Sequence, residues 1–304
     1  MAVYTPHKII LFGEHAVVYG YPALSAAVDL FARISVIPSR NGAQFSTFVN
    51  RTLNYLGLKD VIVKVETQVP SGSGLGTSSM IISGILYHER NYDKESLAKE
   101  AFEIEYSVQG SGSPIDATTI VAGGYVLTNG SGGIPLWTVE KDTRKWNFSS
   151  IPAKATDLVI VYTGSKGSTR EQVAKVRKFY ERGKLAKDVM ESIGNITSEG
   201  VREVIRGNLD KIGELMNENH SELKIFGIST ETIEKVVSLG RDYGYGAKLT
   251  GAGGGGAVII LPKDREKLRA KLREMNLMFF ETSTTNVGIF RERQEPQDLG
   301  TQSG

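Results

Sequence analysis

The sequence predicts an α+β protein built from two domains, and three observations support this prediction. The chain has 304 residues, of which 40% are apolar, so it can bury more than one small core. In the first half, short apolar runs typical of strands alternate with helical patterns across glycine-rich loops. After a new apolar run at residues 157–163 the patterns are mainly helical. We therefore expect a boundary near residue 155, with domains at residues 1–155 and 156–292.

Hydrophobic periodicity predicts the elements of the first domain. Strands are expected where apolar residues run together or alternate with polar ones, at residues 8–12, 61–69 and 124–127. Helices are expected where apolar residues recur every three or four positions, at residues 78–89 and 94–108. This alternation predicts helices packed on a sheet.

The second domain opens with the strand-like run at 157–163 and continues with helical patterns at 169–182, 209–226 and 230–243. Its remaining predicted elements are an AVIILP strand at 257–262, a lysine-rich helix from Lys263 and a last strand near 286–290. The segment 293–304 is polar and without apolar period, so we expect a frayed tail. No internal repeat is visible.

Composition narrows the class of protein. The net charge of +2, from 36 basic and 34 acidic residues spread along the chain, argues against nucleic-acid and membrane-surface partners. The absence of cysteine excludes disulfides, thiolate metal sites and cysteine nucleophiles, and it suits a reducing compartment or a hot, oxidising habitat. No apolar run approaches the roughly 18 residues of a spanning helix. We expect a cytoplasmic protein that is neither exported nor embedded in a membrane.

The strongest local signal is a glycine-rich loop between an apolar strand and an apolar helix. Glycines let several backbone N–H groups converge, and the helix dipole adds positive potential, so this arrangement favours a phosphate. The lysine of a Walker A loop is missing, and a surface turn with a Ser/Thr cap is the alternative. The loop residues are Pro70, Ser71, Gly72, Ser73, Gly74, Leu75, Gly76, Thr77, Ser78 and Ser79.

A second glycine run, residues 248–256, reads KLTGAGGGG. It matches G-x-G-x-x-G, but a dinucleotide fingerprint opens a helix, whereas this run leads into the AVIIL strand. A plain linker is one interpretation. The other is a backbone wall against phosphate or substrate, formed by Gly251, Ala252 and Gly253.

Ionisable residues stand at several places where the local pattern does not require them. Lys8 precedes a strand, and Glu14 and His15 follow a glycine, although a solvated lysine and a capping glutamate would explain them as well. Glu105 borders the apolar face of a helix, so either a metal or an arginine is its expected partner. Asp116 follows Ser-Pro-Ile, which equally suits a capping box, but nearby glycines would admit a ligand.

Phosphoryl transfer requires a backbone cradle, a lysine at the phosphates, oxygen ligands for magnesium and a carboxylate facing the acceptor. The chain offers a candidate for each. Competing chemistries lack parts, since no H-x-H, H-E-x-x-H or G-x-S-x-G pattern is present.

Three segments together resemble the motifs of the GHMP kinase superfamily, in the same order and over nearly the whole chain. They are PHKIILFGEHAVVYG at 6–20, GSGLGTSS at 72–79 and KLTGAGGGG at 248–256. The GEHAVV segment is similar to the branch that phosphorylates mevalonate on its 5-hydroxyl, and the compact length is typical of archaeal members. The resemblance implies an N-terminal domain like ribosomal protein S5 domain 2, a ferredoxin-like C-terminal domain, and ATP bound between them.

The resemblance also implies roles for individual residues. Asp116 matches the carboxylate that faces the acceptor hydroxyl, and Lys8 matches the lysine beside it. Ser78 and Glu105 match the ligands of Mg2+. The two glycine segments would hold ATP.

Glu14, His15 and Thr169 match residues around the substrate, a small molecule for which mevalonate is expected. A homodimer is one assembly that this family resemblance allows. Departures from the family pattern are His7, Thr77 and Pro114, and the segment 39–59 is short, which implies a reduced substrate lid. The alternatives are another GHMP enzyme (a phosphomevalonate kinase, a mevalonate 3-kinase or a diphosphomevalonate decarboxylase) and a non-catalytic ligand sensor, which would be expected to lose Lys8, Glu105 or Asp116.

Overall fold

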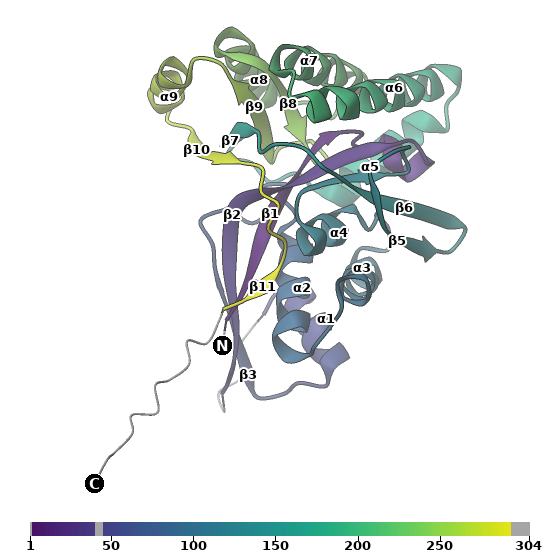
Figure 1. The fold of residues 1–304 in the computed structure, drawn as a ribbon, viewed down its shortest axis with the longest axis vertical. Helices are drawn as coiled ribbons and strands as arrows, with labels where there is room; N and C mark the ends of the chain where they lie inside the picture. Colours follow the sequence, from purple (N-terminus) through teal and green to yellow (C-terminus); the bar gives the residue numbers. More distant parts are fainter. Residues whose placement is uncertain (1, 40–44, 293–304) are drawn as a thin grey trace.

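A computed structural model describes residues 2–39 and 45–292, which form two antiparallel sheets with helices on their outer sides (Figure 1). The predicted tail at 293–304 lies outside the described residues. The smaller sheet begins at Asp157, close to the predicted start of the second domain. However, the chain returns to the larger sheet at its last described strand, so the division into 1–155 and 156–292 stays a proposal about folding units.

The larger sheet has the strand order β11-β1-β2-β4-β6-β5, with β3 pairing β2 beside this path. Helices α1 to α4 lie along one side of it (Figure 1). The strands are β1 (Val3–Phe12), β2 (Ala23–Pro38), β3 (Val61–Glu66), β4 (Tyr125–Thr128), β5 (Ile134–Lys141), β6 (Arg144–Ile151) and β11 (Phe290–Arg291). The helices are the short 3-10 helix η1 (Ala16–Tyr19), α1 (Thr47–Leu56), α2 (Thr77–Glu89), α3 (Lys94–Gln109) and α4 (Ile115–Ala122).

The smaller sheet has the order β10-β7-β9-β8, and α7 and α8 pack on it (Figure 1). Its strands are β7 (Asp157–Tyr162), β8 (Gly244–Thr250), β9 (Ala257–Pro262) and β10 (Met278–Ser283). The helices of this half are α5 (Thr169–Tyr180), α6 (Lys184–Arg206), α7 (Leu209–Ile225), α8 (Glu231–Tyr243) and α9 (Arg265–Glu274).

The continuous apolar runs of β7 and β9 are explained by burial on both faces. Successive side chains of a strand point to opposite sides. In β9, Ile259 and Leu261 join the core shared with β1, whereas Val258 and Ile260 join the core under α8. The smaller sheet is therefore an inner layer between the larger sheet and its own helices.

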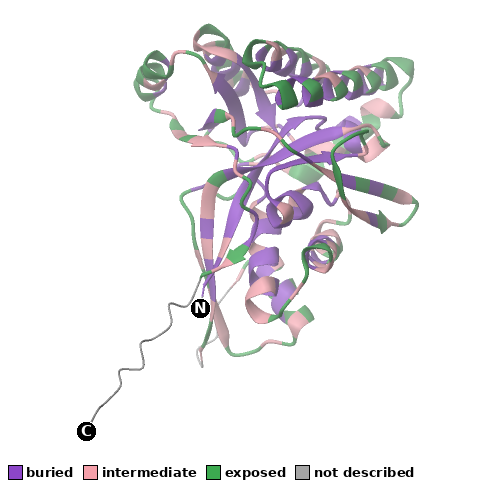
Figure 2. Cartoon of the chain, viewed as in Figure 1, coloured by how far each residue is buried: buried purple, intermediate pink, exposed green. Residues whose placement is uncertain are grey.

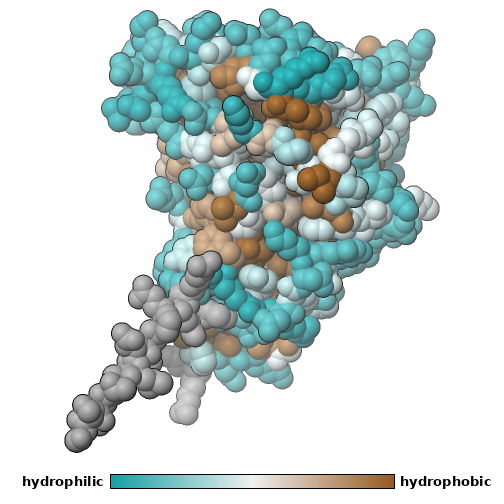
Figure 3. Space-filling view, viewed as in Figure 1, coloured by the Kyte–Doolittle hydropathy of each residue, from teal (hydrophilic) through white to brown (hydrophobic). Residues whose placement is uncertain are grey.

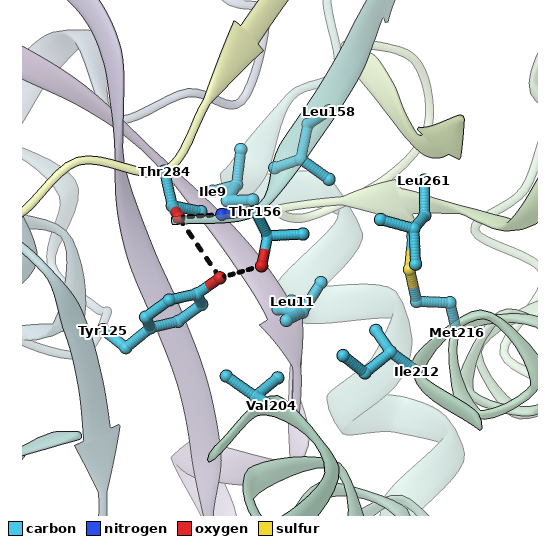
Figure 4. A pocket seen from close by; sticks show the side chains of 10 residues that line it. All are labelled: Ile9, Leu11, Tyr125, Thr156, Leu158, Val204, Ile212, Met216, Leu261 and Thr284. Atoms are coloured by element: carbon cyan, nitrogen blue, oxygen red, sulfur yellow. Dashed lines mark hydrogen bonds between the residues drawn. The ribbon is translucent and has the colours of Figure 1, made fainter. Parts of the chain in front are cut away.

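The two segments that connect the sheets, one before β7 and one after β10, are joined by a hydrogen bond. Thr156 precedes β7 and Thr284 follows β10. The N–H of Thr156 donates to Thr284 Oγ1 at 2.9 Å, and the hydroxyl of Tyr125 in β4 lies 2.7 Å from Thr156 Oγ1 (Figure 4). Apolar side chains from both sheets surround these three hydroxyls (Figure 4). This packing fixes how the two sheets sit relative to each other.

Burial follows this layered arrangement, with buried strands in the middle and exposed residues on the outer helices (Figure 2). On the face that Figure 3 shows, hydrophilic side chains cover the outer helices, and hydrophobic ones gather in small separate groups nearer the middle. Within the described residues, no helix is long and apolar enough to cross a membrane.

The predicted helices and strands are present within a few residues of their expected ends, but several elements were missed. The longest helix, α6, escaped because Gly194 and Gly200 interrupt its pattern. A Cβ at Gly200 would stand 2.5 Å from the ring of Phe12, so close packing on β1 requires the glycine. Near the end of the chain β10 was missed, and β11 begins only at Phe290, the last residue of the predicted segment 286–290. The other missed elements are η1, β2, α1, α4, β5, β6 and β8.

Candidate functional site

The first glycine loop runs from the end of β3 to the start of α2, as predicted. Gly72, Gly74 and Gly76 have φ values of 81°, 81° and 77°, in the left-handed region that side chains rarely adopt. A Cβ at Gly76 would stand 2.9 Å from Cγ of Lys8. No side chain caps α2 at Gly76, so the N–H groups of its first turn are available to an anion.

The second glycine loop packs directly against the first. A Cβ on Gly74 would stand 3.1 Å from the carbonyl oxygen of Thr250, and one on Gly251 would stand 3.1 Å from that of Gly74. The loop joins β8 to β9, which confirms that it leads into a strand and does not open a helix. The two loops therefore form one continuous backbone wall, and the plain-linker interpretation is wrong.

This wall borders a cavity of about 720 Å³. The predicted site residues that line the cavity are Lys8, Glu14, His15, Ser71, Gly72, Gly74, Gly76, Thr77, Ser78, Glu105, Asp116, Thr169, Gly251 and Ala252. The predicted residues that do not line it are Pro70, Ser73, Leu75, Ser79 and Gly253. Most of these support the loops from behind: Leu75, for example, is 1% exposed and belongs to the core between the sheets.

Lys8 and Asp116 meet at the cavity wall. Lys8 lies within β1 and is 2% exposed, so it is not the solvated lysine considered above. Its ammonium is 3.0 Å from Oδ1 of Asp116 and 3.2 Å from the carbonyl oxygen of Gly74. The capping-box interpretation of Asp116 is wrong, because α4 begins after Pro114 and has no side-chain cap. The Asp116 carboxylate, 30% exposed, is instead available to a ligand.

Glu105 of α3 is held by hydroxyl and amide groups, which contradicts the expected alternative of an arginine partner. The hydroxyls of Ser78 and Ser79 donate to its two carboxylate oxygens, and Nε2 of Gln109 donates to Oε1 at 3.0 Å. Burial, together with the negative charge of Asp116, raises the pKa of Glu105 to about 6. A carboxylate in this setting favours the approach of a cation.

Glu14 forms a buried ion pair with Lys248, a partner that the sequence did not indicate. The two side chains are 1% and 0% exposed. Lys248 also donates to the carbonyl oxygen of Leu249 at 2.8 Å. Burial raises the pKa of Glu14 and lowers that of Lys248, and the contact between them opposes both shifts. The pair joins the end of β1 to β8, so Glu14 is not a surface cap.

His15 connects the first motif to the second glycine loop. Its φ is 63°, in a tight turn closed by a bond of 2.7 Å from the N–H of Ala16 to the carbonyl of Glu14. Its Nε2 lies 3.0 Å from the carbonyl oxygen of Ala252, so Nε2 carries the proton. Burial lowers the pKa of His15 to about 4, which keeps the imidazole neutral.

Some buried polar atoms at the site have no hydrogen-bond partner among the described residues. These are Oε2 of Glu14, Oγ of Ser73 and Oγ1 of Thr77. They lie at the glycine loop and the cavity, where a polar ligand could satisfy them. Arg170, beside Thr169, also lines the cavity and was missed. The sequence could have indicated Arg170 as a site residue, because its cationic side chain directly follows Thr169, a predicted substrate residue.

Comparison with known proteins identifies the family. The family profile described as the GHMP kinases N terminal domain matches residues 45–124, and that described as GHMP kinases C terminal matches residues 201–279. A curated relative from Thermococcus sibiricus is 33% identical over 311 residues, which cover 86% of this chain and 89% of the relative. The chain therefore belongs to the GHMP kinase family and is a kinase.

The relatives within this family carry a more specific name. The Thermococcus sibiricus protein is a mevalonate kinase. The crystal structure of the Methanococcus jannaschii mevalonate kinase covers 93% of this chain and 98% of its own, with a TM-score of 0.76 and 27% identity. That of L. major mevalonate kinase in complex with R-mevalonate has a TM-score of 0.77, covers 94% of this chain and 96% of its own, and is 24% identical, a likeness of fold. The predicted two-domain fold of this family is confirmed.

Proposed function

We propose that this kinase transfers the γ-phosphoryl group of Mg-ATP to the 5-hydroxyl of mevalonate and releases ADP and 5-phosphomevalonate, a step of isoprenoid precursor synthesis. The observation that carries the proposal is the meeting of Lys8, Asp116 and the glycine wall at one cavity. The mevalonate kinases among its relatives support the acceptor.

The geometry supports a direct transfer. The acceptor hydroxyl lies against Asp116, which orients it or accepts its proton, and the hydroxyl oxygen forms the new bond to phosphorus while the bond from phosphorus to the ADP oxygen breaks. Lys8 stabilises negative charge on the transferred group. The N–H groups of the glycine loops and of the first turn of α2 bind the ATP phosphates.

The residues at the cavity suit a magnesium ion. Mg2+ prefers oxygen ligands and commonly takes only one or two carboxylates beside phosphate and water. Ser78 and Glu105 offer a hydroxyl and a carboxylate at the cavity wall, and Thr77 adds a buried hydroxyl without a described partner. The bound ion would neutralise charge on the phosphates. Among the described residues no cluster of three or more His, Cys, Asp or Glu could hold a metal alone, which fits an ion that arrives with ATP.

The acceptor end of the cavity supports a small hydroxy acid. Among the residues that line the cavity, Ile10, Val17 and Val18 are apolar, and His15, Arg170 and Thr169 carry polar groups. Retention of Lys8, Glu105 and Asp116 at the cavity disfavours a silent ligand sensor. The cysteine-free composition leads us to keep the cytoplasm as the proposed location. The homodimer stays a prediction, and size-exclusion chromatography can test it.

The test is ADP release with Mg-ATP and a panel of acceptors: mevalonate, 5-phosphomevalonate, galactose and homoserine. We expect mevalonate to be used at least about 10²-fold more efficiently than the others, because unpaired polar groups cost a few kcal/mol. Phosphorus NMR of the product should show the 5-phosphate. A 3-phosphate, or brisk turnover of another acceptor without turnover of mevalonate, would overturn the acceptor and leave the kinase assignment standing.

A further inference from the structure

His7 stands beside the cavity without lining it, and its side chain contacts both ends of the first glycine loop. The residue lies in β1, one position before Lys8, and is completely buried. Its Nδ1 is 3.3 Å from the carbonyl oxygen of Leu75, near the end of the loop. Its Nε2 is 3.0 Å from Oγ1 of Thr67, at the start of the loop. One imidazole therefore spans the segment that curls around the phosphate position.

The partners of His7 assign its protons. A carbonyl oxygen can only accept, so Nδ1 carries the hydrogen and donates to Leu75. The lone pair of Nε2 then accepts the hydroxyl hydrogen of Thr67. Oγ1 of Thr67 in turn accepts the N–H of Val69 at 3.1 Å. Burial lowers the pKa of His7 to about 4, so the imidazole stays neutral and this chain of bonds persists at neutral pH.

The peptides that His7 anchors also position the ammonium of Lys8. The carbonyl of Leu75 accepts the backbone N–H of Lys8 at 3.2 Å as well as the His7 bond. The preceding carbonyl, that of Gly74, accepts the Lys8 ammonium at 3.2 Å. The loop itself contains a backbone bond from Ser73 to Pro70 at 3.3 Å, and its glycines allow it several conformations. Its shape therefore depends on contacts from outside the loop, which include those from β1 and from the second glycine loop.

We propose that His7 is a positioning residue that clamps the glycine loop to β1, and so fixes the phosphate-binding N–H groups and the Lys8 ammonium in one arrangement. Loss of this contact should therefore affect the nucleotide side of the site more than the acceptor side. Loss of the clamp loosens the loop where ATP binds and moves Lys8 relative to Asp116, whereas the acceptor wall around Val17 and Val18 does not touch His7. The kinetic part of this inference rests on the proposed kinase function, and its structural part does not.

The first test replaces the imidazole. His7→Phe removes both bonds, and we expect kcat/KM for ATP to fall by about 10²-fold, because misplacement of catalytic groups by about 1 Å has effects of this size. The KM for the acceptor should stay within about 2-fold, a selectivity that general loss of packing would not produce. His7→Asn keeps a donor for Leu75 and loses Thr67, so it should retain part of the activity.

The second test isolates the Thr67 bond and keeps the proposal testable if His7→Phe does not fold. Thr67→Val should lower kcat/KM for ATP by the same factor as His7→Asn. The double variant His7→Asn/Thr67→Val should lower it no further than either single variant, because both substitutions remove the same contact. Thr5→Val is the matched control: Thr5 is a buried threonine of the same strand, and its hydroxyl has no described partner. It should leave the kinetics unchanged.

Two further measurements do not depend on the acceptor. Calorimetric binding of a magnesium complex of a non-hydrolysable ATP analogue should weaken in His7→Phe, and amide hydrogen exchange at residues 71–76 should become faster. Wild-type nucleotide affinity and wild-type exchange in His7→Phe and Thr67→Val would overturn the clamp. If the wild-type protein does not phosphorylate mevalonate, the proposed function fails, while nucleotide binding and exchange still decide the role of His7.

Discussion

The ammonium of Lys248 binds the carboxylate of Glu14 inside the protein, although 234 positions of sequence separate the two residues. Glu14 follows β1 of the larger sheet, and Lys248 lies in β8 of the smaller one. This ion pair connects the two sheets at the wall of the cavity, which Glu14 lines. It also holds the turn that presents His15 to the second glycine loop.

The first prediction concerns the stability of this pair. Lys248→Met should lower the free energy of unfolding by about 3–5 kcal/mol, because it leaves the Glu14 carboxylate buried without its partner. The double variant Glu14→Leu/Lys248→Met should recover most of that loss, since apolar groups carry no desolvation cost. Urea denaturation of the two variants and the wild type measures both values. Equal stability of the single and double variants would contradict a buried charged pair.

The second prediction concerns Asp116. Asp116→Asn and Asp116→Ala should reduce turnover by at least about 10²-fold, because a carboxylate facing the acceptor acts mainly in the transition state. The affinity for an ATP analogue should hardly change. Because Asp116 does not cap α4, any loss in the free energy of unfolding should come from its ion pair with the buried Lys8 and not from a lost helix cap. An Asp116→Ala enzyme that is active but less stable would disprove the assignment.

The third prediction concerns magnesium. Glu105→Gln should raise the Mg2+ concentration needed for half-maximal activity, because a neutral amide binds a hard dication less well than a carboxylate. Ser78→Ala should do so more mildly. Ser79→Ala is the matched control, since Ser79 also donates to Glu105 but does not line the cavity. Identical magnesium titrations for Ser78→Ala and Ser79→Ala would remove Ser78 from the metal site, and an unshifted Glu105→Gln titration would remove Glu105.

The fourth prediction concerns acid stability. Burial lowers the pKa of His220 to about 4 and outweighs the Glu234 hydrogen bond, which raises it. In the unfolded chain His220 therefore takes up a proton as the pH falls below 6.5, the ordinary pKa of the imidazole. In the folded protein this imidazole stays neutral until the pH reaches about 4. The free energy of unfolding should therefore decline as the pH falls from 6.5 to about 4 and then level off. This group accounts for a decline of at most about 3 kcal/mol.

The measurement is the free energy of unfolding in urea at several pH values between about 7 and 4. His220→Gln lacks the titrating imidazole and should lose stability less steeply over this range than the wild type. The other two imidazoles whose pKa burial lowers to about 4, those of His7 and His15, are unchanged in this variant. They should therefore leave a residual slope. Parallel curves for the wild type and His220→Gln would contradict the lowered pKa.

Local signals in the sequence were sufficient for much of the fold and of the candidate site. The apolar pattern predicted α2 and α3 almost to the residue, because α3 has an apolar face and α2 is apolar on most of its sides. It failed for α6, because close packing against Phe12 requires a glycine at position 200, and this glycine interrupts the helical pattern. It missed β10, which carries polar residues at a sheet edge.

The same division holds at the site. The sequence by itself singled out the residues that we propose carry the chemistry: two glycine loops, a lysine, and carboxylates at 14, 105 and 116. It left the alternatives for Glu105 and Asp116 open, because capping and charge pairing look alike in a linear pattern. The tertiary structure decided that Asp116 pairs with Lys8, that serines hold Glu105 and that Lys248 holds Glu14. These contacts join residues far apart in the chain, and long-range partners are chosen by packing and burial, which no local spacing encodes.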